Sequence, residues 1–178
     1  MSNQEFSIAL WLRLHNETQN DTNGQIFTIG NWGTAWTVQR ATIFIKNNNK
    51  LYFTISNGTN SIEENGPQSE ALVPNRWYHV AAIIKNNTAY LYINGELASS
   101  YLLNYLPNFD SASNVYIGGN STAVGKYDIG DIRVYNHALS LLEIKALNQA
   151  LMFHYSFNFP NTQLIANETG LSSPTTIS

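Results

Sequence analysis

Residues 75–97 constrain the fold more than any other stretch of the chain. Their side chains alternate between two sides up to residue 84. One side carries Tyr78, Val80, Ala82 and Ile84, and the other carries Trp77, His79, Ala81 and Ile83. A period of two is that of a β-strand. A second apolar run begins at Tyr90, and Asn94-Gly95 then supplies the two positive-φ residues of a tight hairpin turn. The stretch therefore predicts an antiparallel β-meander.

Most of the other predicted elements are also strands. Strands are predicted over residues 6–14, 25–30, 37–45, 51–56, 114–118 and 129–135. Residues 99–109 are aromatic but irregular and contain Pro107, so they are predicted to form a connection. One helix is predicted over residues 141–149, because Ser140 and Glu143 form a capping box.

Composition narrows the classes of protein that fit this pattern. A chain of 178 residues is expected to form one domain. The net charge is −3 and no Lys/Arg cluster occurs, which argues against nucleic acid or anionic membrane as partners. The absence of cysteine leaves packing and strand pairing to hold the fold. No apolar run approaches the roughly 20 residues of a membrane span, and the first residues do not resemble a signal peptide.

Five motifs in sequence order identify a family. They are FSIALWL at 6–12, RWYHVA at 76–81, LYINGE at 91–96, VYIGGN at 115–120 and GDIRVYNHALS at 130–140. Together they resemble laminin-G-like domains of the concanavalin A-like lectin/glucanase superfamily, over about residues 6–149. The resemblance implies an all-β fold, a two-sheet antiparallel jelly-roll sandwich with one short helix.

The end of the chain departs from the family pattern. Residues 151–159 alternate aromatic and polar side chains like the strand with which family members usually begin, but here this strand comes last. We expect residues 1–159 to form the sandwich, with 151–159 completing it, and residues 160–178 to be a loop-like tail. Two explanations stay open: the chain is a circularly permuted domain, or it comes from a tandem array and carries the beginning of the next copy. In either case we expect the strand to complete a sandwich, within its own chain or swapped between copies.

The sequence predicts that the chain is not an enzyme. Glycoside hydrolysis needs two carboxyl groups roughly 5 to 9 Å apart across a cleft. Most of the 12 acidic residues fall in predicted loops, turns or the helix cap, and the Glu-x-Asp-x-x-Glu strand motif of the family's glucanases is absent. The four histidines lack the spacing of metal ligands.

Calcium is the one cofactor that the family resemblance suggests. Relatives often bind it through loop Asp and Asn oxygens, and Asp110, Asn120 and Asp128 flank the strand predicted at 114–118. The alternative is that these residues occupy loops because they form turns.

Exposed aromatic side chains are the best candidates for a ligand site, because sugar rings stack on apolar faces. Trp11 and Trp77 lie within predicted strands and are assigned to the core. The candidates lie in predicted loops or connections: Trp32, Trp36, Tyr101, Tyr105 and Phe109. The alternative role for these five is to cover the edges of the sandwich.

These observations predict a non-catalytic recognition module that binds cell-surface carbohydrate, within a larger extracellular or virion-surface protein. The expected partner is a glycan or glycoprotein. A second hypothesis is an assembly module that binds protein, or further copies of itself, by exchanging its terminal strand. A glycoside hydrolase is the third.

Overall fold

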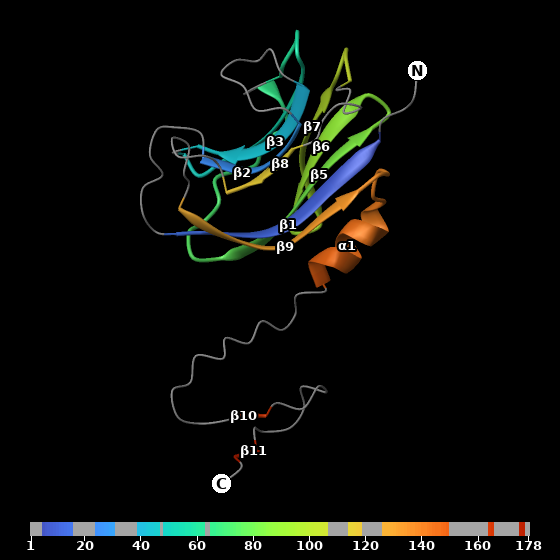
Figure 1. Cartoon of the computed structure of the whole chain (residues 1–178). Helices are drawn as coiled ribbons and strands as arrows, with labels where there is room; N and C mark the ends of the chain where they lie inside the picture. Colours follow the sequence, from blue (N-terminus) through green and yellow to red (C-terminus); the bar gives the residue numbers. More distant parts are fainter. Residues whose placement is uncertain are drawn as a thin grey trace.

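The computed structural model forms a sandwich of two antiparallel sheets (Figure 1). The structure describes residues 5–15, 24–30, 39–46, 48–62, 65–106, 114–118, 126–149, 164–165 and 175–176. The prediction of a two-sheet antiparallel β-sandwich with one short helix is confirmed.

The larger sheet has five strands in the order β7-β6-β5-β1-β9. Their bounds are β1 Phe6–Leu14, β5 Trp77–Lys85, β6 Thr88–Ile93, β7 Glu96–Leu102 and β9 Tyr127–Tyr135. The meander predicted at 75–97 is its centre, and Asn94 and Gly95 have φ values of 52° and 83°, as the predicted turn requires. Strand β1 lies between β5 and β9, and its register on β9 shifts between Ala9 and Trp11.

The smaller sheet has four strands in the order β4-β3-β2-β8. Their bounds are β2 Gly24–Gly30, β3 Gln39–Ile45, β4 Leu51–Asn57 and β8 Val115–Ile117. Alternate residues of both sheets point inward, and large apolar side chains such as Leu10, Leu12, Ile43 and Phe53 are fully buried between the sheets. This alternation is why these segments form strands: each strand has one apolar face, and burying that face away from water lowers the free energy.

Strand β7 differs from the prediction. It continues to Leu102, so the prediction of an irregular connection is wrong for residues 99–102. Ser99, Ser100 and Tyr101 pair with β6 at Leu91, Tyr90 and Ala89. Because β7 is an edge strand exposed along nearly all of its length, it shows no apolar alternation in sequence and is held by backbone pairing.

Helix α1, Leu141–Gln149, lies on the outer face of the five-stranded sheet (Figure 1). Its buried residue Ile144 joins a second apolar cluster with Leu139, Ala9, Ala81 and Ile83. The predicted capping box is confirmed: the Ser140 backbone N–H and hydroxyl both donate to Glu143 Oε2 at 2.7 Å, and the Glu143 N–H donates to the Ser140 hydroxyl at 3.3 Å.

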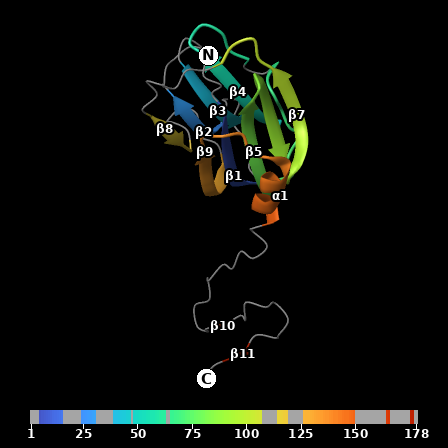
Figure 2. The ribbon, with the colours of Figure 1, turned by 90° about the vertical axis from the view of Figure 1, so that its right-hand side faces the viewer.

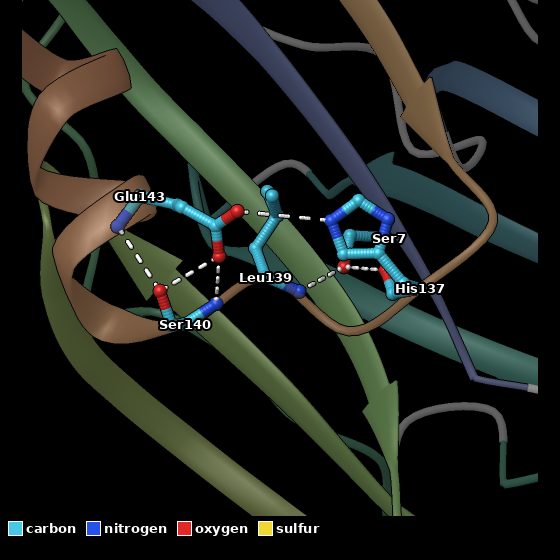
Figure 3. A network of polar contacts seen from close by, with 5 residues as sticks. All are labelled: Ser7, His137, Leu139, Ser140 and Glu143. Carbon is cyan, nitrogen blue, oxygen red and sulfur yellow. Dashed lines mark hydrogen bonds and ion pairs between the residues drawn. The ribbon is translucent and has the colours of Figure 1, made fainter.

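A buried hydroxyl on β1 fixes the segment that leads into the helix (Figure 3). The Ser7 hydroxyl donates to the His137 carbonyl oxygen at 2.9 Å and accepts from the Leu139 N–H at 2.9 Å. Ser7 is fully buried. This side chain therefore satisfies two backbone groups that would otherwise lack partners away from water.

Replacing Ser7 by alanine is expected to lower the free energy of unfolding by about 2 kcal/mol, because a buried N–H and a carbonyl lose their partner. The matched control is Ser140→Ala, which removes an exposed cap and should cost about 1 kcal/mol. Urea unfolding at neutral pH measures both. A Ser7→Ala loss no larger than that of Ser140→Ala would show that water replaces the buried hydroxyl.

The C-terminal region is described at four residues. Strands β10 (Leu164–Ile165) and β11 (Thr175–Thr176) pair with each other, within the tail predicted to be loop-like. The strand predicted at 151–159 lies outside the described residues. In the part of the chain that is described, no helix is long and apolar enough to cross a membrane.

Candidate functional site

The structure describes three of the eight residues predicted to bind ligand or metal, namely Tyr101, Tyr105 and Asp128. The other five lie outside the described residues: Trp32, Trp36, Phe109, Asp110 and Asn120.

The two tyrosines have different surroundings. Tyr101 is exposed on β7. Tyr105 is half-buried against the main core, and its hydroxyl donates to the Ile55 carbonyl oxygen at 3.1 Å. Burial, with a smaller contribution from Tyr101, raises the pKa of Tyr105 to about 12. Tyr105 therefore has a structural role, and Tyr101 is the one of the two that a ligand could contact.

Asp128 lies on β9, directly opposite Arg13 of β1, and not in a loop. Arg13 Nε donates to Asp128 Oδ2 at 2.7 Å, and His15 Nε2 lies 2.9 Å from Asp128 Oδ1. These hydrogen bonds, first that of His15 and then that of Arg13, lower the pKa of Asp128 below its ordinary value. The carboxylate is thus held ionised between two basic side chains.

The surroundings of Asp128 do not fit a calcium ion. Calcium needs several free oxygen ligands, but both oxygens of Asp128 contact basic side chains, and Arg13 Nη2 approaches Oδ2 to 2.5 Å. Among the described residues, no three His, Cys, Asp or Glu side chains are grouped so as to hold a metal. A calcium site stays a prediction that rests on Asp110 and Asn120.

The outer face of the five-stranded sheet, on which Arg13 lies, also carries two tryptophans. Trp11 and Trp77 belong to the side of β1 and β5 that points away from the main core. The Arg13 guanidinium carbon lies 5.1 Å from the centre of the Trp77 ring, within the range of a cation–π contact. Gly130 of β9 leaves room beside them: a Cβ at this position would lie 3.9 Å from the Trp77 ring and from Trp11 Cβ. The assignment of Trp77 to the core is wrong, because its side chain is half-buried on the outer face.

His79 of β5 lies directly opposite Trp11 of β1, on the same face of the sheet. Its side chain is 2% exposed, and its ring centroid lies 5.4 Å from that of Trp11. Burial lowers the pKa of His79 to about 4; Asp131 opposes the shift and Arg133 adds to it. The imidazole is therefore neutral at neutral pH, and Trp11 packs on an uncharged ring.

We call the set Arg13, His15, Trp77 and Asp128 the Trp77 surface. It combines an aromatic ring and a planar guanidinium with a carboxylate and an imidazole, all partly exposed. Sugars need these two kinds of partner: flat faces for their C–H surfaces and fixed polar groups for their hydroxyls.

Sequence reasoning missed the Trp77 surface because it took a tryptophan inside a strand to be buried. A signal was present in the sequence. Trp11, Arg13 and His15 alternate on one side of the first strand, and two basic residues on that side indicate a face that meets water.

The two packed antiparallel sheets with one helix on the outside define a lectin-like β-sandwich domain. The chain belongs to the concanavalin A-like lectin/glucanases superfamily, whose laminin-G family model matches residues 1–145. The predicted resemblance is thus confirmed. No curated protein sequence gives a match.

Solved structures with the same fold include parts of sialidases and toxins. A Trypanosoma rangeli sialidase in complex with 2,3-difluoro-KDN matches at TM-score 0.63 and 18% identity, over 85% of this chain and 24% of the sialidase. The CBM40 of a Ruminococcus gnavus IT-sialidase, bound to α2,3-sialyllactose, matches at TM-score 0.60 and 17% identity, over 82% of this chain and 83% of that domain.

The botulinum neurotoxin serotype G binding domain matches at TM-score 0.62 and 20% identity, over 83% of this chain and 36% of that one. The chain therefore spans only about a quarter of the sialidase and about a third of the toxin binding domain. At these identities the likeness establishes the fold.

Proposed function

We propose that this chain is a non-catalytic carbohydrate-binding module and that it binds glycan through the Trp77 surface. The observation that carries the proposal is the partly exposed Trp77 ring in cation–π contact with Arg13, with Asp128 and His15 bound beside that guanidinium. The superfamily supports the class of ligand, and a CBM40 bound to sialyllactose supports the choice of first probe. The setting that we propose is an extracellular or virion-surface protein.

The proposal that the module is non-catalytic is supported by the ionised, hydrogen-bonded carboxylate of Asp128. A glycosidase needs a protonated carboxyl group as general acid beside a second carboxyl group. The pKa of Asp128 is lowered and its carboxylate is engaged by Arg13 and His15, so it is unsuited to donate a proton at neutral pH.

The test is a glycan-array screen of the 178-residue chain that includes α2,3-sialyllactose and lactose, once with calcium and once with chelator. We expect binding that persists in chelator, because the Trp77 surface offers no free carboxylate for a metal. Binding that disappears in chelator would favour the calcium site predicted at Asp110 and Asn120. A blank array in both conditions contradicts the proposed function.

Variants of the strongest array hit then locate the site. Trp77→Ala is expected to weaken binding at least tenfold, because stacking on an aromatic ring is lost. Tyr101→Ala tests another exposed aromatic, one that the sequence predicts to bind ligand. Tyr101 lies on the far edge strand β7, away from the Trp77 surface, and we expect this variant to bind like the parent chain. If Trp77→Ala binds as well as the parent chain, while Trp32→Ala or Trp36→Ala loses at least tenfold in affinity, the site lies at residues 31–38 instead.

One observation favours the second hypothesis, an assembly module. Three apolar side chains on the edge strands β8 and β9 are about half exposed, although they lie on the core side of their sheets. Such a surface fits a protein partner better than a sugar.

A further inference from the structure

The two edge strands β8 and β9 lie on the same side of the sandwich (Figure 2). On β8, Val115 and Ile117 are 54% and 57% exposed, and on β9, Val134 is 49% exposed. Exposed apolar residues on a sheet edge are a common site of strand addition.

These three side chains belong to the inner faces of the sheets. Residues directly opposite each other on paired strands point to the same face. Ile117 is opposite Phe27, and Val134 is opposite Ile8, and both of these partners are buried in the main core. Val115 is opposite Ile29, which packs against that core. Among the described residues, the core is thus open on the side where β8 and β9 lie.

The chain carries a segment with the matching pattern just after the helix. Phe153, Tyr155, Phe157 and Phe159 alternate with polar residues, so one face of a strand at 151–159 would be wholly aromatic. We infer that this strand, supplied by a second copy of the chain, adds to the β9 edge and inserts its aromatic face between β8 and β9.

The position of the helix favours a strand from a second copy. Near the helix end, Asn148 donates to the Asn94 carbonyl oxygen at 3.2 Å, at the β6–β7 turn. From β6 to a position beyond β9 is four strand spacings, about 19 Å across the sheet. Phe153 follows Asn148 by five residues, which reach at most about 18 Å when fully extended. Within one chain, Phe153 falls short of the slot, and only the residues from Tyr155 onward could enter it. A strand supplied by a second copy can place all four aromatic residues there.

The surface involved is large enough for a stable pair. Four aromatic side chains bury about 150 to 250 Å² each, or about 600 to 1,000 Å² from one strand. This is close to the area of about 800 Å² per partner in a standard specific interface. A reciprocal exchange between two copies would bury it twice.

Cysteine cross-linking tests which copy supplies the strand, because the chain has no cysteine of its own. A chain carrying Val134→Cys is mixed in urea with a second chain that carries Phe153→Cys, Tyr155→Cys or Phe157→Cys. The two chains are then refolded together and oxidised. We expect a disulfide-linked heterodimer with at least one of the three. His154→Cys and Ser156→Cys, on the polar face, are the matched controls and should not link, because their Cβ atoms point away from Val134.

Two results would overturn the inference. One is the absence of a link with all three aromatic positions. The other is a link that forms within single chains when Val134→Cys is combined with each of these substitutions, which would mean that the strand folds back in cis.

A second measurement does not depend on cross-linking. Sedimentation of the full chain should show a dimer. The double variant Tyr155→Asp/Phe157→Asp should have a dimer dissociation constant at least tenfold higher. His154→Asp with Ser156→Asp adds the same charge to the polar face and should leave the dimer intact. A parent chain that stays monomeric at all concentrations contradicts the inference.

Discussion

Alanine in place of Gly30 is expected to lower the free energy of unfolding by about 4 kcal/mol. Gly30 ends β2 with a φ of 124°, a conformation that residues with a side chain rarely adopt. A Cβ here would lie 2.2 Å from the Gln39 carbonyl oxygen and 2.7 Å from Arg40 Cα. Both are backbone atoms of the paired strand β3, so the clash cannot be relieved by a change of rotamer.

Gly118→Ala is the matched control, because Gly118 also has a positive φ, 82°, but a Cβ there meets no atom within 4 Å. It should cost only the strain of the left-handed backbone, about 1 kcal/mol. Urea unfolding of both variants separates the clash from the strain. If the two losses were equal, backbone conformation alone would explain them, and the close approach of β2 and β3 would be wrong.

The second large effect is a loss of stability in acid caused by His79. Its folded-state pKa is about 4, below the ordinary value of 6.5 that it should have in the unfolded chain. Protons therefore bind more readily to the unfolded state between these values. The stabilisation is present in full above pH 6.5 and is lost as the pH falls to 4. The shift corresponds to at most about 3 kcal/mol.

His79→Gln isolates this contribution, because glutamine stays neutral across the range. The free energy of unfolding, measured by urea at steps between pH 7.5 and 4, should fall more steeply for the parent chain than for the variant. Asp128 also titrates in acid, but it is present in both proteins and cancels in the difference. Parallel curves for the two proteins would mean that His79 is hydrated in the folded state.

The fold could be predicted from sequence where one face of an element is buried. The first strand and the meander alternate because their inner faces form the core, and Asn94-Gly95 marks a turn by its backbone chemistry. The extension of β7 over residues 99–102 could not be predicted, since an edge strand exposed on both faces carries no periodic signal. The extent of β7 is set by its backbone pairing with β6.

The Trp77 surface could not be predicted for a different reason. Arg13 and Asp128 are 115 positions apart in sequence, and they meet because β9 is added to β1 in one particular register. Shifting this register by one residue would move Asp128 to the other face of the sheet. The residue types are visible in the sequence, but their neighbours depend on strand pairing.

The place of β1 in the sheet also bears on how the chain folds during synthesis. Both neighbours of β1, the strands β5 and β9, come later in the chain, and β9 ends at Tyr135. Strand β1, which is buried along nearly all of its length, thus leaves the ribosome long before either partner exists. Contacts between such distant segments make folding slow, on the order of milliseconds to seconds. At about 5 to 20 residues per second, β1 would wait several seconds for β9, an interval in which a chaperone could bind the nascent chain.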